Sequence, residues 1–129
     1  MEENKKILIV DDIFTNRLLL TEILKDLNYQ ISQASNGKEA VELIEKEDFD
    51  LVLMDIEMPV MNGLETTIFI RKNMSSQKSK IPIVALTAHN PNLFFESHKD
   101  VGFDELLTKP YSIAKIKGVI DLVLASKSN

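Results

Sequence analysis

Short, uninterrupted apolar runs recur along the chain and alternate with segments of helical periodicity. Residues 7–10, 51–54 and 81–86 are the three strongest runs, each rich in Ile, Val or Leu. Continuous runs of this length are typical of strands buried on both faces, as in parallel sheets. Residues 30–35 are more polar and predict an edge strand, and residues 105–107 predict a weak fifth strand.

Apolar residues at helical spacing follow each predicted strand. The first such segment carries Leu20, Ile23, Leu24 and Leu27 at the spacing of a helix with one buried face, with Thr15 as the expected N-cap. The other helices are expected at about 37–48, 63–74, 91–101 and 112–126, and Asn36 and Ser112 are expected caps. The expected buried faces are Ala40, Val41 and Ile44; Leu64, Thr67, Ile68 and Arg71; and Ile113, Ile116, Ile120 and Val123.

Strands and helices alternate strictly, in the order βα repeated five times. This order predicts the α/β fold class, with a parallel sheet, helices on both of its faces and right-handed crossovers. In open sheets of this kind, ligands bind beyond the carboxyl ends of the strands. The residues directly after each strand therefore hold the information about function.

Three aspartates follow two of the buried strands. Asp11 and Asp12 come after the first strand, and Asp55 comes after the third. Any one of them alone could be a solvated turn residue or a helix cap. Three like charges at one edge repel one another unless a cation binds or their pKa values rise. Oxygen ligands suit a hard cation, so the sequence favours a Mg²⁺ site over surface acidity.

Thr87 and Lys109 follow the fourth and fifth strands and are expected at the same edge. A helix cap and a structural ion pair are their ordinary roles. Together with Mg²⁺ and an aspartate, however, a hydroxyl and an ammonium group are what phosphoryl transfer to a carboxylate requires. The strand ends thus favour an aspartyl-phosphate chemistry.

Composition narrows the class of protein. The 129 residues include 15 Lys and Arg and 20 Asp and Glu, which gives a net charge of −5, and there is no cysteine. This length predicts a single domain, residues 1–129. The acidic balance argues against direct nucleic-acid binding. The apolar runs are too short for a membrane span, and no signal peptide precedes them, so a cytoplasmic protein is expected. His89 and His98 share no zinc-binding motif.

Four stretches carry a family resemblance: residues 7–12 (ILIVDD), 53–63 (LMDIEMPVMNG), 85–88 (ALTA) and 102–110 (GFDELLTKP). With these motifs at successive strand ends, the chain resembles the receiver domain of two-component response regulators, the fold of the bacterial chemotaxis regulator. The second stretch is similar to receivers of hybrid sensor kinases and phosphorelays. The resemblance implies a doubly wound, flavodoxin-like sheet of order 2-1-3-4-5. It also implies a signalling switch that catalyses its own phosphorylation and dephosphorylation, not an enzyme.

The resemblance assigns roles around the acidic residues. Asp55 would accept the phosphoryl group. Asp12, Asp55 and the backbone carbonyl of Glu57 would bind Mg²⁺ directly, and Asp11 would act through a metal-bound water. The side chain of Glu57, two residues after the acceptor, would influence the hydrolysis of the phosphorylated form. His89, two residues after Thr87, would have the same influence or be an exposed loop residue.

The resemblance also implies how the switch works. Thr87 would bond to the phosphoryl group and shift toward it, and Lys109 would pair with a phosphoryl oxygen. The Lys109–Pro110 peptide bond would be cis. Pro59 and Gly63 would shape the loop after Asp55. The family's usual Tyr or Phe three residues before the lysine is Leu106 here, so a rotating aromatic ring is missing, and Tyr111 is expected only to pack at the start of the last helix.

A sensor histidine kinase or a histidine phosphotransfer protein would be the phosphate-delivering partner. Docking candidates are Ile13, Phe14, Leu18 and Pro110, although Phe14 and Leu18 could instead lie in the core. One of the adjacent Phe94 and Phe95 is expected to be exposed on the fourth helix, and a homodimer on the face of the fourth and fifth helices is possible. Residues 125–129 are expected to fray, and the chain is either a stand-alone receiver or part of a longer protein.

Three alternatives remain beside the receiver interpretation. A haloacid-dehalogenase-like phosphatase would need Asp-x-Asp after the first strand, where this chain has adjacent Asp11 and Asp12. A flavodoxin-like cofactor binder would need a first loop that does not repel phosphate. A pseudo-receiver that serves only as an interaction module would lack some of the acidic pair, the acceptor or the lysine, all of which are present here.

Overall fold

The strand and helix order of the computed structural model follows the apolar pattern. The model describes residues 5–58, 60–88 and 100–127. The strands are β1 (Lys6–Val10), β2 (Gln30–Ala34), β3 (Leu51–Asp55), β4 (Ile83–Thr87) and β5 (Glu105–Thr108). The helices are α1 (Phe14–Asp26), α2 (Gly37–Lys46), α3 (Gly63–Asn73), the short η1 (Lys78–Lys80) and α5 (Ile113–Lys127).

The five strands form one parallel sheet in the order β2-β1-β3-β4-β5. The fold class and the strand order that the sequence predicted are thereby confirmed. The polar β2 lies at one edge and the short β5 at the other, as their composition indicated. β1 and β3 are adjacent although a strand and two helices separate them in the sequence, so their carboxyl ends lie side by side.

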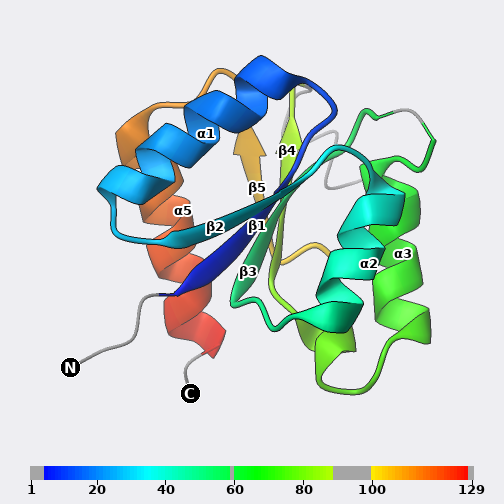
Figure 1. The fold of residues 1–129 in the computed structure, drawn as a ribbon. Coiled ribbons are helices and arrows are strands. Elements are labelled where there is room, and N and C mark those ends of the chain that lie inside the picture. The colour runs from blue at the N-terminus through cyan, green and yellow to red at the C-terminus, as the bar shows by residue number, and fades with distance from the viewer. Residues whose placement is uncertain (1–4, 59, 89–99, 128–129) are drawn as a thin grey trace.

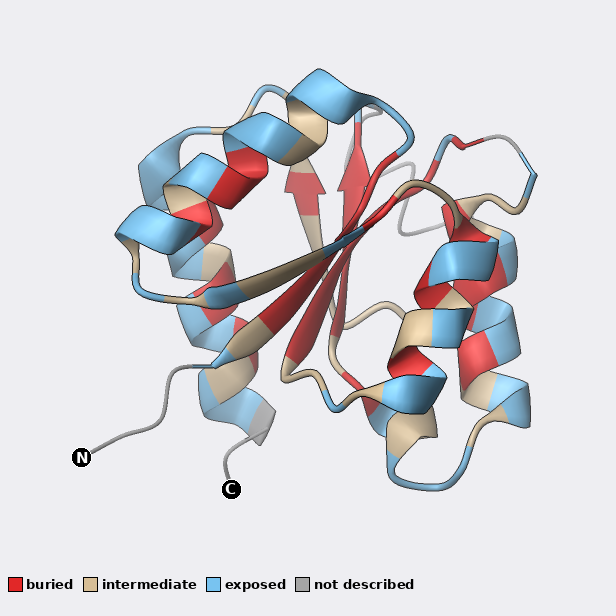
Figure 2. Ribbon diagram, viewed as in Figure 1, coloured by how far each residue is buried: buried red, intermediate tan, exposed pale blue. Residues whose placement is uncertain are grey.

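Helices cover both faces of the sheet. Figure 1 shows α1 and α5 on one face and α2 and α3 on the other. The central strands β1, β3 and β4 are buried almost throughout, the edge strands β2 and β5 are only partly buried, and the outer sides of the helices are exposed (Figure 2). The cluster on the α1 and α5 face includes Ile9, Leu24, Leu53, Leu86 and Ile120, and that on the α2 and α3 face includes Leu8, Val10, Ile44, Val52 and Ile70. The uninterrupted apolar runs are explained by this double burial.

Side-chain caps fix the start of three helices. Asn36 Oδ1 accepts a hydrogen bond from the backbone N–H of Glu39 at the start of α2, and Ser112 Oγ accepts one from Lys115 before α5. Both predicted caps are thus confirmed. At α3, Asn62 and Glu65 exchange hydrogen bonds between their side chains and each other's backbone N–H, which is a capping box.

The predicted start of the first helix was wrong. The N-cap of α1 is Ile13, without a side-chain cap, and Thr15 lies exposed in the first turn. The reason is the preceding turn, in which Asp11 Oδ1 accepts a hydrogen bond from the Ile13 N–H at 2.9 Å. The Asp11 side chain bends the chain directly after β1, so the helix begins before Thr15 can cap it.

Two predicted buried residues are exposed. Ile68 is 38% exposed on α3, where Ile70 is fully buried instead, and Ile113 is 59% exposed at the start of α5. The buried face of α3 consists of Gly63, Thr66, Thr67 and Ile70. Small and β-branched residues form this face because two close approaches lie on it: Gly63 lies against the Asp55 carbonyl oxygen, and the Thr66 hydroxyl lies against Gly37 of α2. Contact with neighbouring elements, and not hydropathy, therefore selects the buried face of α3.

Some predictions concern residues outside those that the structure describes. These are the fourth helix at about 91–101, Phe94 and Phe95, His89 and His98, and the contribution of Pro59 to its loop. Within the described ranges, no helix is both long and apolar enough to cross a membrane.

Candidate functional site

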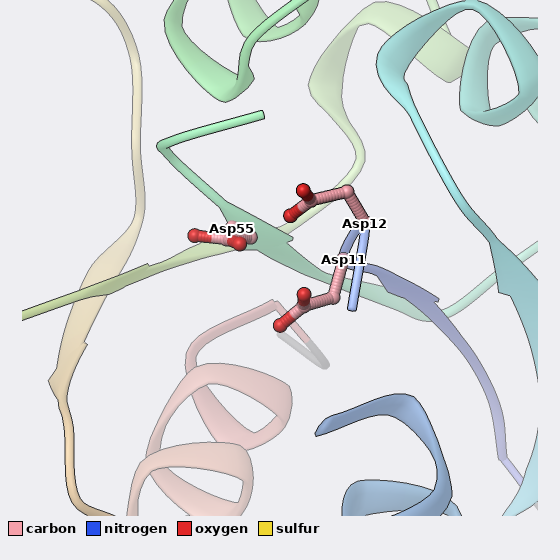
Figure 3. Close-up of side chains that lie close together, drawn as sticks. All are labelled: Asp11, Asp12 and Asp55. Carbon is pink, nitrogen blue, oxygen red and sulfur yellow. The ribbon is translucent and has the colours of Figure 1, made fainter. Parts of the chain in front are cut away.

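Three carboxylates meet where β1 and β3 end. Ligand oxygens of Asp11, Asp12 and Asp55 all lie within 4.8 Å of one another. We call these three residues the acidic site; their side chains are drawn in Figure 3. Asp11 is fully buried, Asp55 is 3% exposed and Asp12 is exposed to solvent. The predicted convergence of the three aspartates is therefore present in the fold.

Hydrogen bonds from α1 hold the Asp11 side chain. One carboxylate oxygen accepts from the Ile13 N–H and the other from Asn16 Nδ2 at 3.3 Å. The Arg17 guanidinium donates to the Asp11 carbonyl oxygen at 2.7 Å and, through Nε, to Gln33 Oε1 at 3.1 Å. Sequence reasoning missed Asn16 and Arg17. Their only signal was two polar residues in the first turn of a helix that directly follows the acidic pair.

Asp55 lies in an environment that disfavours its charge. Its pKa is raised to about 6, first because the carboxyl group is buried and then because the Asp11 carboxylate repels its charge. The Lys109 ammonium, 3.5 Å from Asp55 Oδ1, and the Glu57 N–H, at 3.3 Å from the same oxygen, act in the opposite direction. The effects of burial and of Asp11 on the pKa of Asp55 are larger than the opposing effects of Lys109 and of the Glu57 N–H.

The loop after Asp55 turns back onto the end of its own strand. The Gly63 N–H donates to the carbonyl oxygen of Ile56 at 3.1 Å. A Cβ atom at position 63 would clash with the Asp55 carbonyl oxygen, so only glycine allows α3 to start this close to Asp55. The side chain of Glu57 is exposed, and its backbone N–H is the group that bonds to Asp55.

β4 and β5 bring the two non-acidic candidates to the same edge. Thr87, the last residue of β4, is 3% exposed and pairs in register with Thr108. The backbone N–H of Lys109 donates to the Thr87 carbonyl oxygen at 2.8 Å. The Lys109–Pro110 peptide bond is cis, as predicted. Thr87 thus ends β4, Lys109 directly follows the neighbouring β5, and the Lys109 side chain reaches back to Asp55.

Leu106 occupies the place of the usual aromatic switch residue. It is partly buried against Ile56 and Ala85, together with Leu64 and Phe103. Leu106 therefore packs with Ile56, which follows Asp55, and with Ala85 on the strand that carries Thr87. An aliphatic side chain links these two elements here, without a ring that could rotate.

Sequence comparison identifies the family. The family model described as "Response regulator receiver domain" matches residues 7–121. The chain belongs to this family. The receiver is therefore a phosphoacceptor domain of two-component and phosphorelay signalling, and not a classical enzyme. The phosphatase, flavodoxin and pseudo-receiver alternatives are set aside.

Its relatives include both small and large signalling proteins. The receiver is 36% identical over 126 residues to sporulation initiation phosphotransferase F of Bacillus subtilis (strain 168), covering 98% of each chain. It is 39% identical over 118 residues to hybrid signal transduction histidine kinase A of Dictyostelium discoideum, which is 90% of the receiver but only 6% of that kinase. The similarity to this kinase therefore extends over only a small part of the kinase.

Two solved structures resemble the receiver over nearly its whole length. One is the receiver domain of a sensor histidine kinase from Pseudomonas aeruginosa PAO1, with a magnesium ion coordinated in its active site cleft. It is 28% identical, has a TM-score of 0.86 and covers 95% of this chain and 99% of that one. The other is response regulator TrrA from Thermotoga maritima, in complex with Mg²⁺-BeF. It is 34% identical, has a TM-score of 0.81 and covers 92% and 98% of the two chains.

Proposed function

We propose that Asp55 accepts a phosphoryl group from a phosphohistidine and that the receiver changes conformation in response. The observation that supports this most directly is the position of the Asp55 carboxylate, buried beside Asp11 and 3.5 Å from the Lys109 ammonium. One oxygen of Asp55 forms a bond to phosphorus while the bond between phosphorus and the histidine nitrogen breaks. The histidine keeps that electron pair and can take up a proton from water.

The acidic site fits Mg²⁺. Three carboxylates with ligand oxygens within 4.8 Å of one another form a hard, negatively charged donor set. Burial and the neighbouring Asp11 charge raise the pKa of Asp55, so a bound cation would favour its charged form. Asp12, Asp55 and the Glu57 carbonyl would hold the ion directly, with Asp11 acting through a bound water. When bound, Mg²⁺ supplies positive charge that offsets the carboxylates and the phosphoryl oxygens.

Thr87 and Lys109 complete the proposed machinery. The Lys109 ammonium already contacts Asp55 and would move to an oxygen of the phosphoryl group once that group is attached. The hydroxyl of Thr87 would donate to another phosphoryl oxygen. Because Thr87 ends β4 and Leu106 packs beside that strand, a shift of the threonine would be transmitted to β5 through this contact.

The first experiment is a phosphorylation assay read by intact-protein mass. The full chain is incubated with Mg²⁺ and phosphoramidate, a small phosphodonor, beside Asp55→Asn and a sample with chelator. We expect one phosphoryl adduct that requires both Mg²⁺ and Asp55. Asp48→Asn, which removes an aspartate with a 93% exposed side chain outside the acidic site, is the matched control and keeps the adduct. No adduct and no donor turnover by the folded wild type would contradict the proposal.

The apolar residues at the start of α1 are the proposed docking surface for the partner that delivers phosphate, a histidine kinase or a phosphotransfer protein. Ile13, Phe14 and Leu18 are 49%, 63% and 46% exposed, so the alternative that Phe14 and Leu18 lie in the core is wrong. Pro110 is also exposed, and it directly follows Lys109, whose ammonium group contacts Asp55. Apolar side chains exposed next to a buried reactive carboxylate are typical of a surface that a partner covers.

The remaining features of the proposed function concern the receiver as a unit. We regard residues 1–129 as a single receiver domain that works in the cytoplasm, where the donors of such pathways carry their phosphohistidine. The proposed homodimer face includes α5, whose Leu122 is 56% exposed. A groove of about 270 Å³ between β5 and α5, lined by Leu106, Gly118 and Leu122 among others, lies on this face.

A further inference from the structure

Tyr111 carries a polar group that the proposed chemistry does not use. The residue lies between β5 and α5, and its ring packs against the buried cluster on the α1 and α5 face. Its hydroxyl oxygen is buried and has no hydrogen-bond partner among the described residues. Buried polar atoms without partners are uncommon in folded proteins, and leaving one unpaired costs free energy. The expected packing role of Tyr111 is confirmed, but it explains the ring and not the hydroxyl.

The charges that act on this hydroxyl belong to the acidic site. Burial raises the pKa of the Tyr111 phenol, and the negative charges of Asp11 and then Asp55 raise it further. Two other buried hydroxyls without partners, those of Thr21 and Thr67, lie within α1 and α3. Tyr111 differs from them because the charges of two metal-binding candidates, Asp11 and Asp55, act on its hydroxyl.

Asp11 is the carboxylate that lies on the Tyr111 side of the sheet. In Figure 3 the Asp11 side chain extends toward the face that α1 and α5 cover, whereas the Asp12 side chain extends away from it. The hydrogen bond from Asn16 of α1 to Asp11 agrees with this direction. The two Asp11 oxygens accept one hydrogen bond each, from Ile13 and Asn16, and a carboxylate can accept about four. Asp11 therefore has capacity for a third donor.

We propose that Tyr111 is a positioning residue of the acidic site, whose hydroxyl donates a hydrogen bond to the Asp11 carboxylate, directly or across one water molecule, when Mg²⁺ is bound. This inference rests on the proposed function, because it needs Mg²⁺ at the acidic site. Hydrogen bonds to metal-binding groups fix the orientation of those groups, and their loss typically weakens metal binding about 10- to 100-fold. A hydroxyl that lacks a partner in the metal-free site gains one on metal binding, so the bond would add to metal affinity.

The test is Tyr111→Phe, which removes the hydroxyl and keeps the ring. Tyr29→Phe is the matched control, because the chain has two tyrosines and Tyr29 packs against the same cluster far from the acidic site, beside Asp121. Titration of each full-length variant with Mg²⁺ in a calorimeter gives the dissociation constant. We expect Tyr111→Phe to bind Mg²⁺ about tenfold more weakly, toward the lower end of that range, and Tyr29→Phe to match the wild type.

A spectroscopic measurement separates positioning from packing. The chain has no tryptophan, so in Tyr29→Phe all aromatic fluorescence above the phenylalanine background comes from Tyr111. A hydrogen bond from the phenol to a carboxylate or its water changes that emission, so we expect Mg²⁺ to change it. This second measurement leaves Tyr111 intact, and it therefore decides the question even where Tyr111→Phe does not fold.

The outcomes are distinguishable from a failure of the proposed function. If the wild type and Tyr111→Phe bind Mg²⁺ equally well, or if Mg²⁺ does not change the fluorescence emission of Tyr111, the positioning role is overturned. The proposed metal site is not contradicted by either result. If the wild type itself does not bind Mg²⁺, the metal site and the positioning role are both overturned. A tenfold loss of affinity in Tyr111→Phe with unchanged unfolding in chelator supports the inference.

Discussion

Asp55 links the chemistry of the receiver to its stability. Its folded-state pKa of about 6 lies above the ordinary value of 3.8, so the folded protein holds the proton more tightly than the unfolded chain does. The resulting stabilisation is complete below about pH 4 and is lost as the pH rises through 6. Charge on this carboxylate therefore destabilises the metal-free domain at neutral pH, where the proposed transfer to Asp55 would take place.

Removing this charge should stabilise the metal-free protein at neutral pH. We expect Asp55→Asn to gain stability over the wild type between pH 4 and pH 8, by up to about 3 kcal/mol, because asparagine does not ionise. Urea unfolding in chelator at the two pH values measures the difference. Added Mg²⁺ should raise the unfolding midpoint of the wild type more than that of Asp55→Asn. An equal pH dependence of both proteins would contradict the assigned environment of Asp55.

Val60 is strained in the loop between β3 and α3. Its φ angle is 72°, which is unfavourable for a β-branched residue, and its side chain is 80% exposed. Val60→Asn should relieve the strain at little cost in packing and stabilise the receiver by about 1 kcal/mol. A thermal unfolding scan checks this expectation. A midpoint equal to or below that of the wild type would show that the loop does not gain from a residue that tolerates this conformation.

Among the elements, α3 is tied to the starts of β4 and β5 by one side chain. The Arg71 guanidinium donates to the carbonyl oxygens of Gly102, Ser79 and Ile81 at 2.7–2.9 Å and to Asp104 Oδ2 at 3.0 Å. Gly102 has a φ of 107°, and a Cβ atom there would press against Arg71. The amino ends of β4 and β5 are thus fixed, while Thr87 and Lys109 lie at the opposite ends.

Loss of this guanidinium should weaken the whole domain. We expect Arg71→Met to lower the free energy of unfolding by about 3 kcal/mol, because the guanidinium no longer donates to three carbonyl oxygens and the Asp104 carboxylate loses its ion pair, although the Ile83 N–H still donates to Asp104 Oδ2. Arg71→Lys should restore only part of it, since an ammonium group cannot span the same acceptors. The neighbouring Lys72 is exposed, and Lys72→Met should stay within about 0.5 kcal/mol of wild type. Similar urea midpoints for the Arg71 and Lys72 variants would contradict the role of Arg71.

At the scale of the whole molecule, the docking surface and the acidic site are separable. Phe14 lies at the start of α1, its ring 5.7 Å from the Arg17 guanidinium that also bonds to the Asp11 carbonyl oxygen. In the proposed function a protein donor covers this surface when it transfers a phosphoryl group to Asp55, whereas a small phosphodonor does not need it. Phosphorylation by a protein donor therefore tests the docking surface together with the acidic site, whereas phosphorylation by a small phosphodonor tests the acidic site alone.

Phe14→Ala should slow transfer from a phosphohistidine-bearing protein by about tenfold and leave phosphorylation by phosphoramidate unchanged. Intact-protein mass over time measures both rates. Ile68→Ala is the matched control, because Ile68 is an exposed apolar residue on α3, on the other face of the sheet. Equal slowing of Phe14→Ala with both donors would mean that Phe14 acts on the acidic site. If Ile68→Ala slowed transfer from the protein donor as much as Phe14→Ala does, the start of α1 would not be the specific docking surface.

Local sequence was sufficient to predict the five strands, the helices that the structure describes between and after them, and two helix caps. Runs such as residues 51–54 have one stable solution, burial on both faces, and Asn36 and Ser112 cap with atoms a few residues away. Thr15 failed as a cap because the Asp11 side chain turns the chain first. Ile68 and Ile113 failed as core residues because the packing partner of a helix, and not its own pattern, selects the buried face.

The sequence by itself determined which residues stand at the strand ends, and so it determined the acidic pair, Asp55, Thr87 and Lys109. Parallel strands carry their last residues to a common edge of the sheet. The prediction that these residues meet there therefore does not depend on the exact bounds of the strands or helices. Only the tertiary structure decided how these residues are set in their surroundings: the burial that raises the pKa of Asp55 and the burial of the Tyr111 hydroxyl without a hydrogen-bond partner among the described residues. Both depend on atoms from distant segments that meet through space, and no local spacing encodes those distances.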